Sequence, residues 1–256
     1  MVNRLTISVI SLTLLVVALL LVTFSITSFA QNSGLQSIAA DIFNDKKLTV
    51  PNTVKNFIVL IPNEAHESPL LPKEQRLINQ PYVPQNLVVG PQTNIIWFSG
   101  DVGHTRKVTL TDDNSKEIFD SILKFNSASD PLSINQSGKF KYHEEDANSQ
   151  DPEFVMEGTI TIANSDSPSS INNNVNDTQP NIETMAILMV PTEDIKEHSE
   201  IIRENNINIL DQYSFKDLRE TGKGGENQTL LVLGSNNPPE ETIAVLKKIT
   251  STLPYS

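Results

Sequence analysis

The feature that most constrains the fold of this chain is a series of short apolar runs between residues 50 and 163. Each run is rich in β-branched or aromatic side chains and is bounded by turn-forming residues, as β-strands are. No long stretch with helical periodicity separates the runs, and this texture is typical of an antiparallel β-sandwich. The predicted strands cover residues 56–61, 85–90, 93–98, 106–111, 139–144 and 158–163.

The N-terminus carries an apolar segment, residues 5–24, which follows Arg4 and contains no charged residue. Ser28 and Ala30 then stand at the −3 and −1 positions of a small-residue cleavage site. The pattern predicts a signal peptide over residues 1–30. A run of about 20 apolar residues is also long enough for an uncleaved membrane anchor, so both alternatives stay open. Either one predicts a secreted or membrane-anchored, extracytoplasmic protein.

Residues 164–181 consist mainly of Asn, Ser, Asp and Pro, with only isolated apolar residues. Such a composition cannot bury enough apolar surface to offset its ordering entropy, so it predicts a disordered linker between two domains. The first domain is the sandwich at 50–163, and the second is a small ferredoxin-like α/β domain at 182–256. Its β-α-β-β-α order follows from apolar runs and helical patterns at 185–190, 191–206, 207–210, 229–234 and 236–253.

Two residues of the first C-terminal helix carry specific expectations. Thr192 precedes the apolar periodicity and is predicted to be the N-cap of that helix. His198 lies within the helical pattern and is interpreted as a surface residue rather than a ligand.

Composition excludes several functional classes. The chain has 31 acidic and 19 basic residues, a net charge of −12, and no cluster of Lys and Arg, which argues against a nucleic-acid partner. The complete lack of Cys excludes disulfides, thiol catalysis, Cys-ligated zinc and iron–sulfur clusters. The 4 His are scattered and support no Ser–His–Asp arrangement, so the chain is not expected to be an enzyme.

The predicted sandwich also contains the motifs of a known family, in order. An aromatic-x-Pro start, a Gly-containing turn, a strand ending in Trp and a His in a polar loop occur at Tyr82, Pro84, Gly90, Trp97 and His104. A Gly-x-aromatic-x-aromatic strand and a later Met-x-Gly occur at Gly138, Phe140, Tyr142, Met156 and Gly158. Together they resemble the cupredoxins, the plastocyanin-like blue copper proteins. The resemblance covers roughly residues 50–163 and implies a cupredoxin-like antiparallel β-sandwich.

The resemblance also implies a copper site, and here the chain departs from the family. Cupredoxins bind copper through two His, one Cys and a weakly bound Met. His104 falls on the first ligand and Met156 on the axial one, but Glu144 occupies the Cys position and the second His has no counterpart. A blue centre requires the thiolate. The resemblance therefore implies a degenerate type 1 site and argues against an ordinary blue-copper electron carrier.

A different metal site remains one interpretation of the same residues. Imidazole, carboxylate and thioether groups together suit copper or another divalent ion. His66 lies in the loop after the first strand and is expected at the same end of the sandwich as His104. His143 adjoins Glu144 on a strand, so the two side chains should point to opposite faces. The candidate ligands are His104, Met156, Glu144, His66 and His143. The alternative is that these His are solvated or hydrogen-bonded and that Met156 packs in the core.

The acidic loop 146–157 offers a calcium interpretation, with Asp146, Asn148, Gln150 and Glu157 at EF-hand-like offsets. Asp151 stands where that loop requires Gly, and a solvated acidic loop is the competing interpretation.

Two functions follow from the sequence. One is an exported cupredoxin-like protein that binds copper or another divalent ion through the degenerate site. The other is a metal-free extracytoplasmic interaction or scaffold module, whose protein partner the sequence does not identify. The sequence leaves copper and no cofactor equally open.

Overall fold

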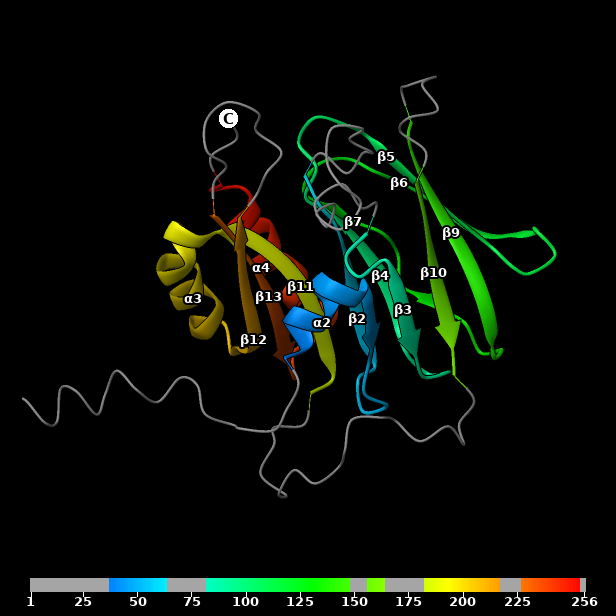
Figure 1. Ribbon diagram of the computed structural model, residues 1–256, viewed down its shortest axis with the longest axis horizontal. Coiled ribbons are helices and arrows are strands. Elements are labelled where there is room, and N and C mark those ends of the chain that lie inside the picture. Colours follow the sequence, from blue (N-terminus) through cyan, green and yellow to red (C-terminus); the bar gives the residue numbers. More distant parts are fainter. Residues whose placement is uncertain (1–36, 64–81, 148–155, 164–181, 217–226, 254–256) are drawn as a thin grey trace, which may run out of the picture. The chain divides into compact units, whose positions relative to one another are not determined.

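The computed structural model describes the chain over residues 37–63, 82–147, 156–163, 182–216 and 227–253 (Figure 1). The predicted signal or anchor at 1–30, the linker at 164–181 and His66 lie outside these described residues. Within the described ranges, no helix has both the length and the apolar character needed to cross a bilayer.

The described helices are α2 (Ile38–Asp45), the short 3₁₀ helix η3 (Thr192–Asp194), α3 (Ile195–Glu204) and α4 (Pro239–Thr250). The strands are β1 (Lys47–Thr49), β2 (Asn56–Ile61), β3 (Asn86–Val89), β4 (Asn94–Ser99), β5 (Arg106–Thr111), β6 (Glu117–Leu123), β7 (Ser127–Ala128), β8 (Leu132–Ser133), β9 (Gly138–Asp146), β10 (Met156–Ile162), β11 (Thr184–Pro191), β12 (Ile207–Lys216) and β13 (Asn227–Ser235).

Two sheets organise these strands. One has the order β1-β3-β10-β9-β5-β6, and the other has the order β12-β13-β11-β2-β4-β7, with β8 also paired to β4. The mainly β architecture, a sandwich followed by an α/β region, confirms the fold class predicted from the sequence. The pairing is mixed rather than purely antiparallel, because β2 runs parallel to β4 and β3 runs parallel to β10.

Aromatic side chains fill the space between the two sheets. Trp97 of β4 stacks on Phe119 of β6 with ring centroids 5.0 Å apart, and its ring meets Tyr142 of β9 edge-on at 6.1 Å. The Tyr142 hydroxyl donates to the carbonyl oxygens of Pro84 and Gln85, both at 3.1 Å. Full burial raises the pKa of Tyr142 well above its usual value, so this hydroxyl is a donor at neutral pH.

Gly158 of β10 leaves room for the Tyr142 ring. A Cβ at Gly158 would lie 2.4 Å from Tyr142 Cε2 and 2.7 Å from the carbonyl oxygen of Gln85. The glycine of the Met-x-Gly motif is therefore explained by core packing.

The α/β region continues the sheet of the sandwich. β11 pairs in parallel with β2, with Thr184, Met185 and Ala186 opposite Asn56, Phe57 and Ile58. The carbonyl oxygen of Glu183 also accepts hydrogen bonds from the backbone amides of Lys55 and Asn56. The predicted β-α-β-β-α order is observed over residues 184–250, and β2 supplies a further strand beside β11. The two regions that the sequence suggested as separate domains thus share one hydrogen-bonded sheet.

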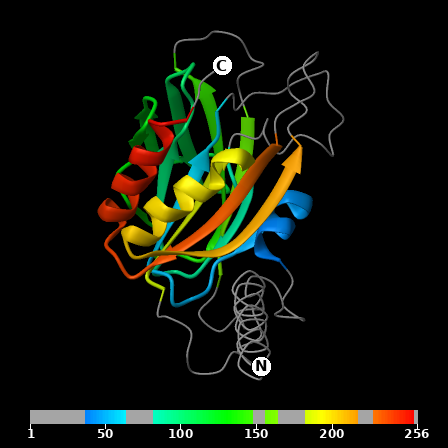
Figure 2. The same ribbon diagram turned by 90° about the vertical axis from the view of Figure 1, so that its left-hand side faces the viewer.

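Helices cover both faces of this shared sheet (Figure 2). On one face, the Thr242 hydroxyl of α4 lies 3.1 Å from the Ser235 hydroxyl of β13. On the other face, Phe43 of α2 contacts the rings of Tyr213 and Phe215 on β12. α2 therefore lies on one face of β12 and β13, and α4 lies on the opposite face together with its neighbour α3 (Figure 2).

Candidate functional site

The candidate site is the loop of residues 100–105, which joins β4 to β5 and contains His104. Successive strand residues point to opposite faces of a sheet. Arg106 therefore shares the inward face of β5 with the buried residues Val108 and Leu110, and its side chain is fully buried. Asp101 follows the end of β4 and is also fully buried. The inward position of Arg106 on β5 thus brings its guanidinium against the buried Asp101 carboxylate of the loop.

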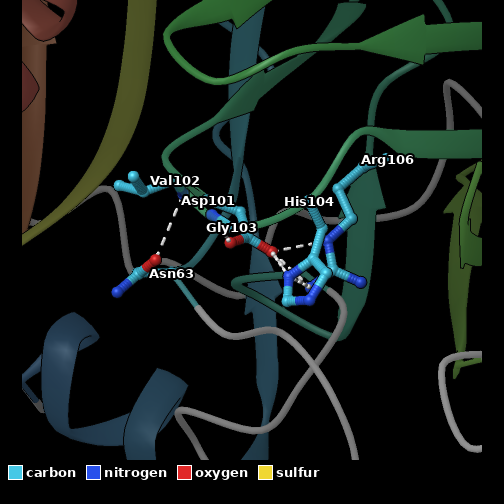
Figure 3. Close-up of polar contacts among 6 residues, drawn as sticks. All are labelled: Asn63, Asp101, Val102, Gly103, His104 and Arg106. Atoms are coloured by element: carbon cyan, nitrogen blue, oxygen red, sulfur yellow. Dashed lines mark hydrogen bonds and ion pairs between the residues drawn. The ribbon is translucent and has the colours of Figure 1, made fainter. Parts of the chain in front are cut away.

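Asp101, His104 and Arg106 form a compact polar cluster (Figure 3). Arg106 donates from Nε to Asp101 Oδ2 at 2.6 Å, and its Nη2 forms an ion pair with the same oxygen. His104 Nδ1 lies 3.3 Å from Asp101 Oδ2 and 3.3 Å from Arg106 Nη2. The His104 side chain is 26% exposed, so the imidazole lies between the buried ion pair and the surface.

The same cluster fixes the backbone of the loop. The other oxygen of Asp101, Oδ1, accepts a hydrogen bond from the Gly103 amide at 3.1 Å. The Val102 amide donates to Asn63 Oδ1 at 3.2 Å, which ties the loop to the end of β2 (Figure 3). The loop conformation is therefore set by side chains of this chain itself.

The electrostatics of the cluster oppose a metal ion at His104 Nδ1. A guanidinium keeps its charge at any physiological pH, and here it already neutralises the buried Asp101 carboxylate. A divalent cation at Nδ1 would place two positive centres a few ångströms apart where the effective dielectric is low. Without a thiolate and with Nδ1 contacted by Arg106, these residues do not fit the copper centre that the cupredoxin resemblance implies.

The strand register locates three other predicted ligands. Glu144 of β9 lies directly opposite Met156 of β10 and opposite Val108 of β5. His143 is paired with Thr109 and Glu157, which places it on the outer face of the sheet. His143 is thus separated by the sheet from the buried Arg106.

The fifth predicted ligand, His66, and most of the proposed calcium loop lie outside the described residues. Among the side chains that the structure describes, no group of three or more His, Cys, Asp or Glu is arranged to hold a metal ion.

Sequence reasoning missed Asp101 and Arg106. A signal was present, because strict alternation in the segment 106–111 puts Arg106 on the apolar face with Val108 and Leu110. A charged residue at an inward position requires a buried partner of opposite charge. The nearest acidic residue upstream is Asp101, in the same loop as His104.

Two expectations for the first C-terminal helix are wrong. Thr192 is not its N-cap, because a 3₁₀ turn occupies Thr192–Asp194 and the α-helix begins at Ile195. The Thr192 hydroxyl contacts the hydroxyl of Thr229 at 2.9 Å instead. His198 is not a surface residue, because it is one of the buried residues of α3 and is 2% exposed.

Comparisons with known proteins give a likeness at the level of fold alone. No protein-family model and no curated protein sequence matches the chain. Among solved structures, a copper-containing nitrite reductase (NirK) from Thermus scotoductus SA-01 matches at 12% identity and a TM-score of 0.34, over 47% of this chain and 28% of that one. Reduced rusticyanin matches at 10% identity and a TM-score of 0.30, over 46% of this chain and 85% of that one. The matched part of this chain thus spans under a third of the length of the nitrite reductase.

Proposed function

We propose that this chain is an exported, cupredoxin-like interaction or scaffold module in which the Asp101–Arg106 ion pair, rather than a metal ion, holds the loop of residues 100–105, here called the site-end loop. The carrying observation is the fully buried guanidinium of Arg106, which contacts both Asp101 and His104. The buried guanidinium orders this loop, which is the role that a bound metal ion has in a metal site. The acidic net charge of −12 favours a protein partner over a nucleic acid.

Copper content after loading tests this proposal. The protein is incubated with Cu(II), desalted, and analysed for metal and by electron paramagnetic resonance, beside His104→Ala and the outer-face control His143→Ala. We expect all three proteins to retain copper only at the level of a non-binding control protein. Stoichiometric copper in the unaltered protein and in His143→Ala, lost in His104→Ala, would overturn the proposal.

The second candidate function is a non-blue copper site, and one observation favours it. The register places Glu144 of β9 directly opposite Met156 of β10 and also opposite Val108 of β5, which is near the end of the loop that contains His104. Retained copper with no intense blue absorption would support this candidate. Substitution of Glu144 by Gln and of Met156 by Leu would then assign its ligands.

A further inference from the structure

His198 is a buried histidine of α3, in which Ser199 and Ile202 are buried as well. It lies one turn into α3, it is 2% exposed, and neither ring nitrogen has a hydrogen-bond partner among the described residues. Buried polar groups in folded proteins are nearly always hydrogen-bonded, so an unpaired imidazole calls for an explanation. None of the contacts described above, including those of the site-end loop, involves His198.

The sheet beneath α3 offers His198 no charged group. The face of β13 that carries Ser235 contacts α4, and by alternation it also carries Thr229, Leu231 and Leu233. The Thr229 hydroxyl is already bonded to those of Thr192 and Ser214, at 2.9 Å each. Ser214 and Gln212 are the β12 partners of Thr229 and Leu231 in the register. The surface under this part of α3 is therefore apolar or uncharged.

Among the residues that the structure describes, the other elements packed against α3 offer no buried charge either. The buried residues of α4 are Thr242, Val245, Leu246, Ile249 and Thr250, and none of them titrates. The charged residues of α4, which are Glu240, Glu241, Lys247 and Lys248, are all exposed. The acidic groups that act on His198 are Asp194 and Glu197, at the start of its own helix. Glu193 of η3 and Lys216 at the end of β12 are exposed.

An imidazolium at this position would be a buried charge without a hydrogen-bonded partner, which is costly. Burial lowers the pKa of His198 from its usual 6.5, and the attraction of Asp194 and Glu197 only partly opposes that effect. When α3 is docked, the His198 imidazole is therefore neutral. When α3 is released, the same imidazole lies in water and has its ordinary pKa.

We propose that His198 makes the packing of α3 on the sheet acid-sensitive, so that protonation of this side chain releases the helix and uncovers the face of β13 that carries Leu231 and Leu233. The released form binds the additional proton at and below pH about 6.5. Stability of the docked helix is therefore complete above that pH and falls as the pH drops, until the lowered pKa of the docked state is reached. Over that window one proton is linked to release, so the release equilibrium shifts by up to about tenfold per pH unit.

Amide hydrogen exchange of the whole protein between pH 7.5 and pH 5 tests the proposal, after correction for the intrinsic pH dependence of exchange. The readout is protection of the peptide that contains α3, referenced to protection of β13. We expect protection of α3 to fall on acidification in the unaltered protein, by up to about tenfold per pH unit. We expect the same fall in the control variant His143→Gln, whose His lies on the outer face of the other sheet.

The variants His198→Leu and His198→Phe fill the same space without a titrating group, and we expect their α3 protection to be independent of pH over this range. Two substitutions are used so that a packing defect in one leaves the other informative, with circular dichroism reporting on folding. Unchanged α3 protection in the unaltered protein between pH 7.5 and pH 5 would overturn the proposal. An undiminished pH dependence in the folded His198 variants would also overturn it.

Discussion

At the scale of single residues, Arg106 decides what the loop of residues 100–105 can do. Its guanidinium reaches Asp101 through Nε and Nη2 and contacts His104 Nδ1, so one side chain connects the carboxylate and the imidazole. The sequence alone placed His104 in this loop through the motif order, and the loop position is where the structure has it. The contact with Arg106 was not predicted, because it depends on the inward direction of a residue whose type usually points to water.

Replacement of Arg106 by Met should destabilise the protein strongly. The substitution leaves the Asp101 carboxylate buried and uncompensated, which typically costs about 3–5 kcal/mol in free energy of unfolding. The double variant Arg106→Met with Asp101→Leu should recover a large part of that loss, because it removes both buried charges. Urea unfolding followed by fluorescence of Trp97, the single Trp of the chain, measures both. Equal losses in the single and the double variant would contradict this account of the pair.

At the scale of elements, most strands of the sandwich could be predicted, because their apolar runs are bounded by turn residues. The predicted bounds of β2 and β5 match the structure, and those of β3, β4, β9 and β10 differ by at most two residues at either end. β12 was predicted only over 207–210. Its second half alternates polar residues with aromatic residues that pack on α2, so no continuous apolar run marks it in the sequence. α2 is 8 residues long, too short to give a clear helical period.

The start of α2 depends on a distant carboxylate. Asp211 of β12 accepts hydrogen bonds through Oδ2 from the Ser37 hydroxyl and the Ala39 amide, both at 2.8 Å. Ser37 is also the N-cap of the helix and accepts from the Ala40 amide. No local sequence pattern could reveal this arrangement, because the two residues are 174 positions apart.

Asp211→Ala should therefore loosen α2 while the sandwich persists. Loss of a capping carboxylate typically costs about 0.5–2 kcal/mol, and we expect faster amide exchange over residues 38–45 with little change in β4 or β9. Gln212→Ala, at the neighbouring exposed position, is the matched control and should leave the exchange of α2 unchanged. If α2 is equally protected from amide exchange in the two variants, Asp211 does not anchor the helix.

At the scale of the whole molecule, the parallel pairing of β11 with β2 joins the α/β region to the sandwich. The sequence indicated both regions, but a composition break such as residues 164–181 says nothing about how the chain pairs on either side of it. The pairing depends on a register between Thr184 and Asn56, which are far apart in the sequence. It is supported by the ion pair of Lys55 and Glu183 at 2.7 Å, although an exposed pair of this kind contributes little by itself.

One shared sheet predicts that both regions unfold together. Trp97 reports on the sandwich, and amide exchange of β13 reports on the α/β region. Their urea transitions should have the same midpoint, as expected for a cooperative unit. Two separated transitions would show that the pairing of β11 with β2 contributes little and that the regions are energetically independent.

The central claim is that an internal ion pair, rather than a metal, organises the site-end loop, and the thermal midpoint of unfolding in the presence of Cu(II) tests it most directly. A ligand that binds only the folded state stabilises it by an amount that grows with the logarithm of the ligand concentration above the dissociation constant, so the midpoint keeps rising as ligand is added. We predict the same midpoint with Cu(II) as with a chelator, in the unaltered protein and in His104→Ala alike. A midpoint that rises with the Cu(II) concentration in the unaltered protein, and stays constant in His104→Ala, would contradict the account.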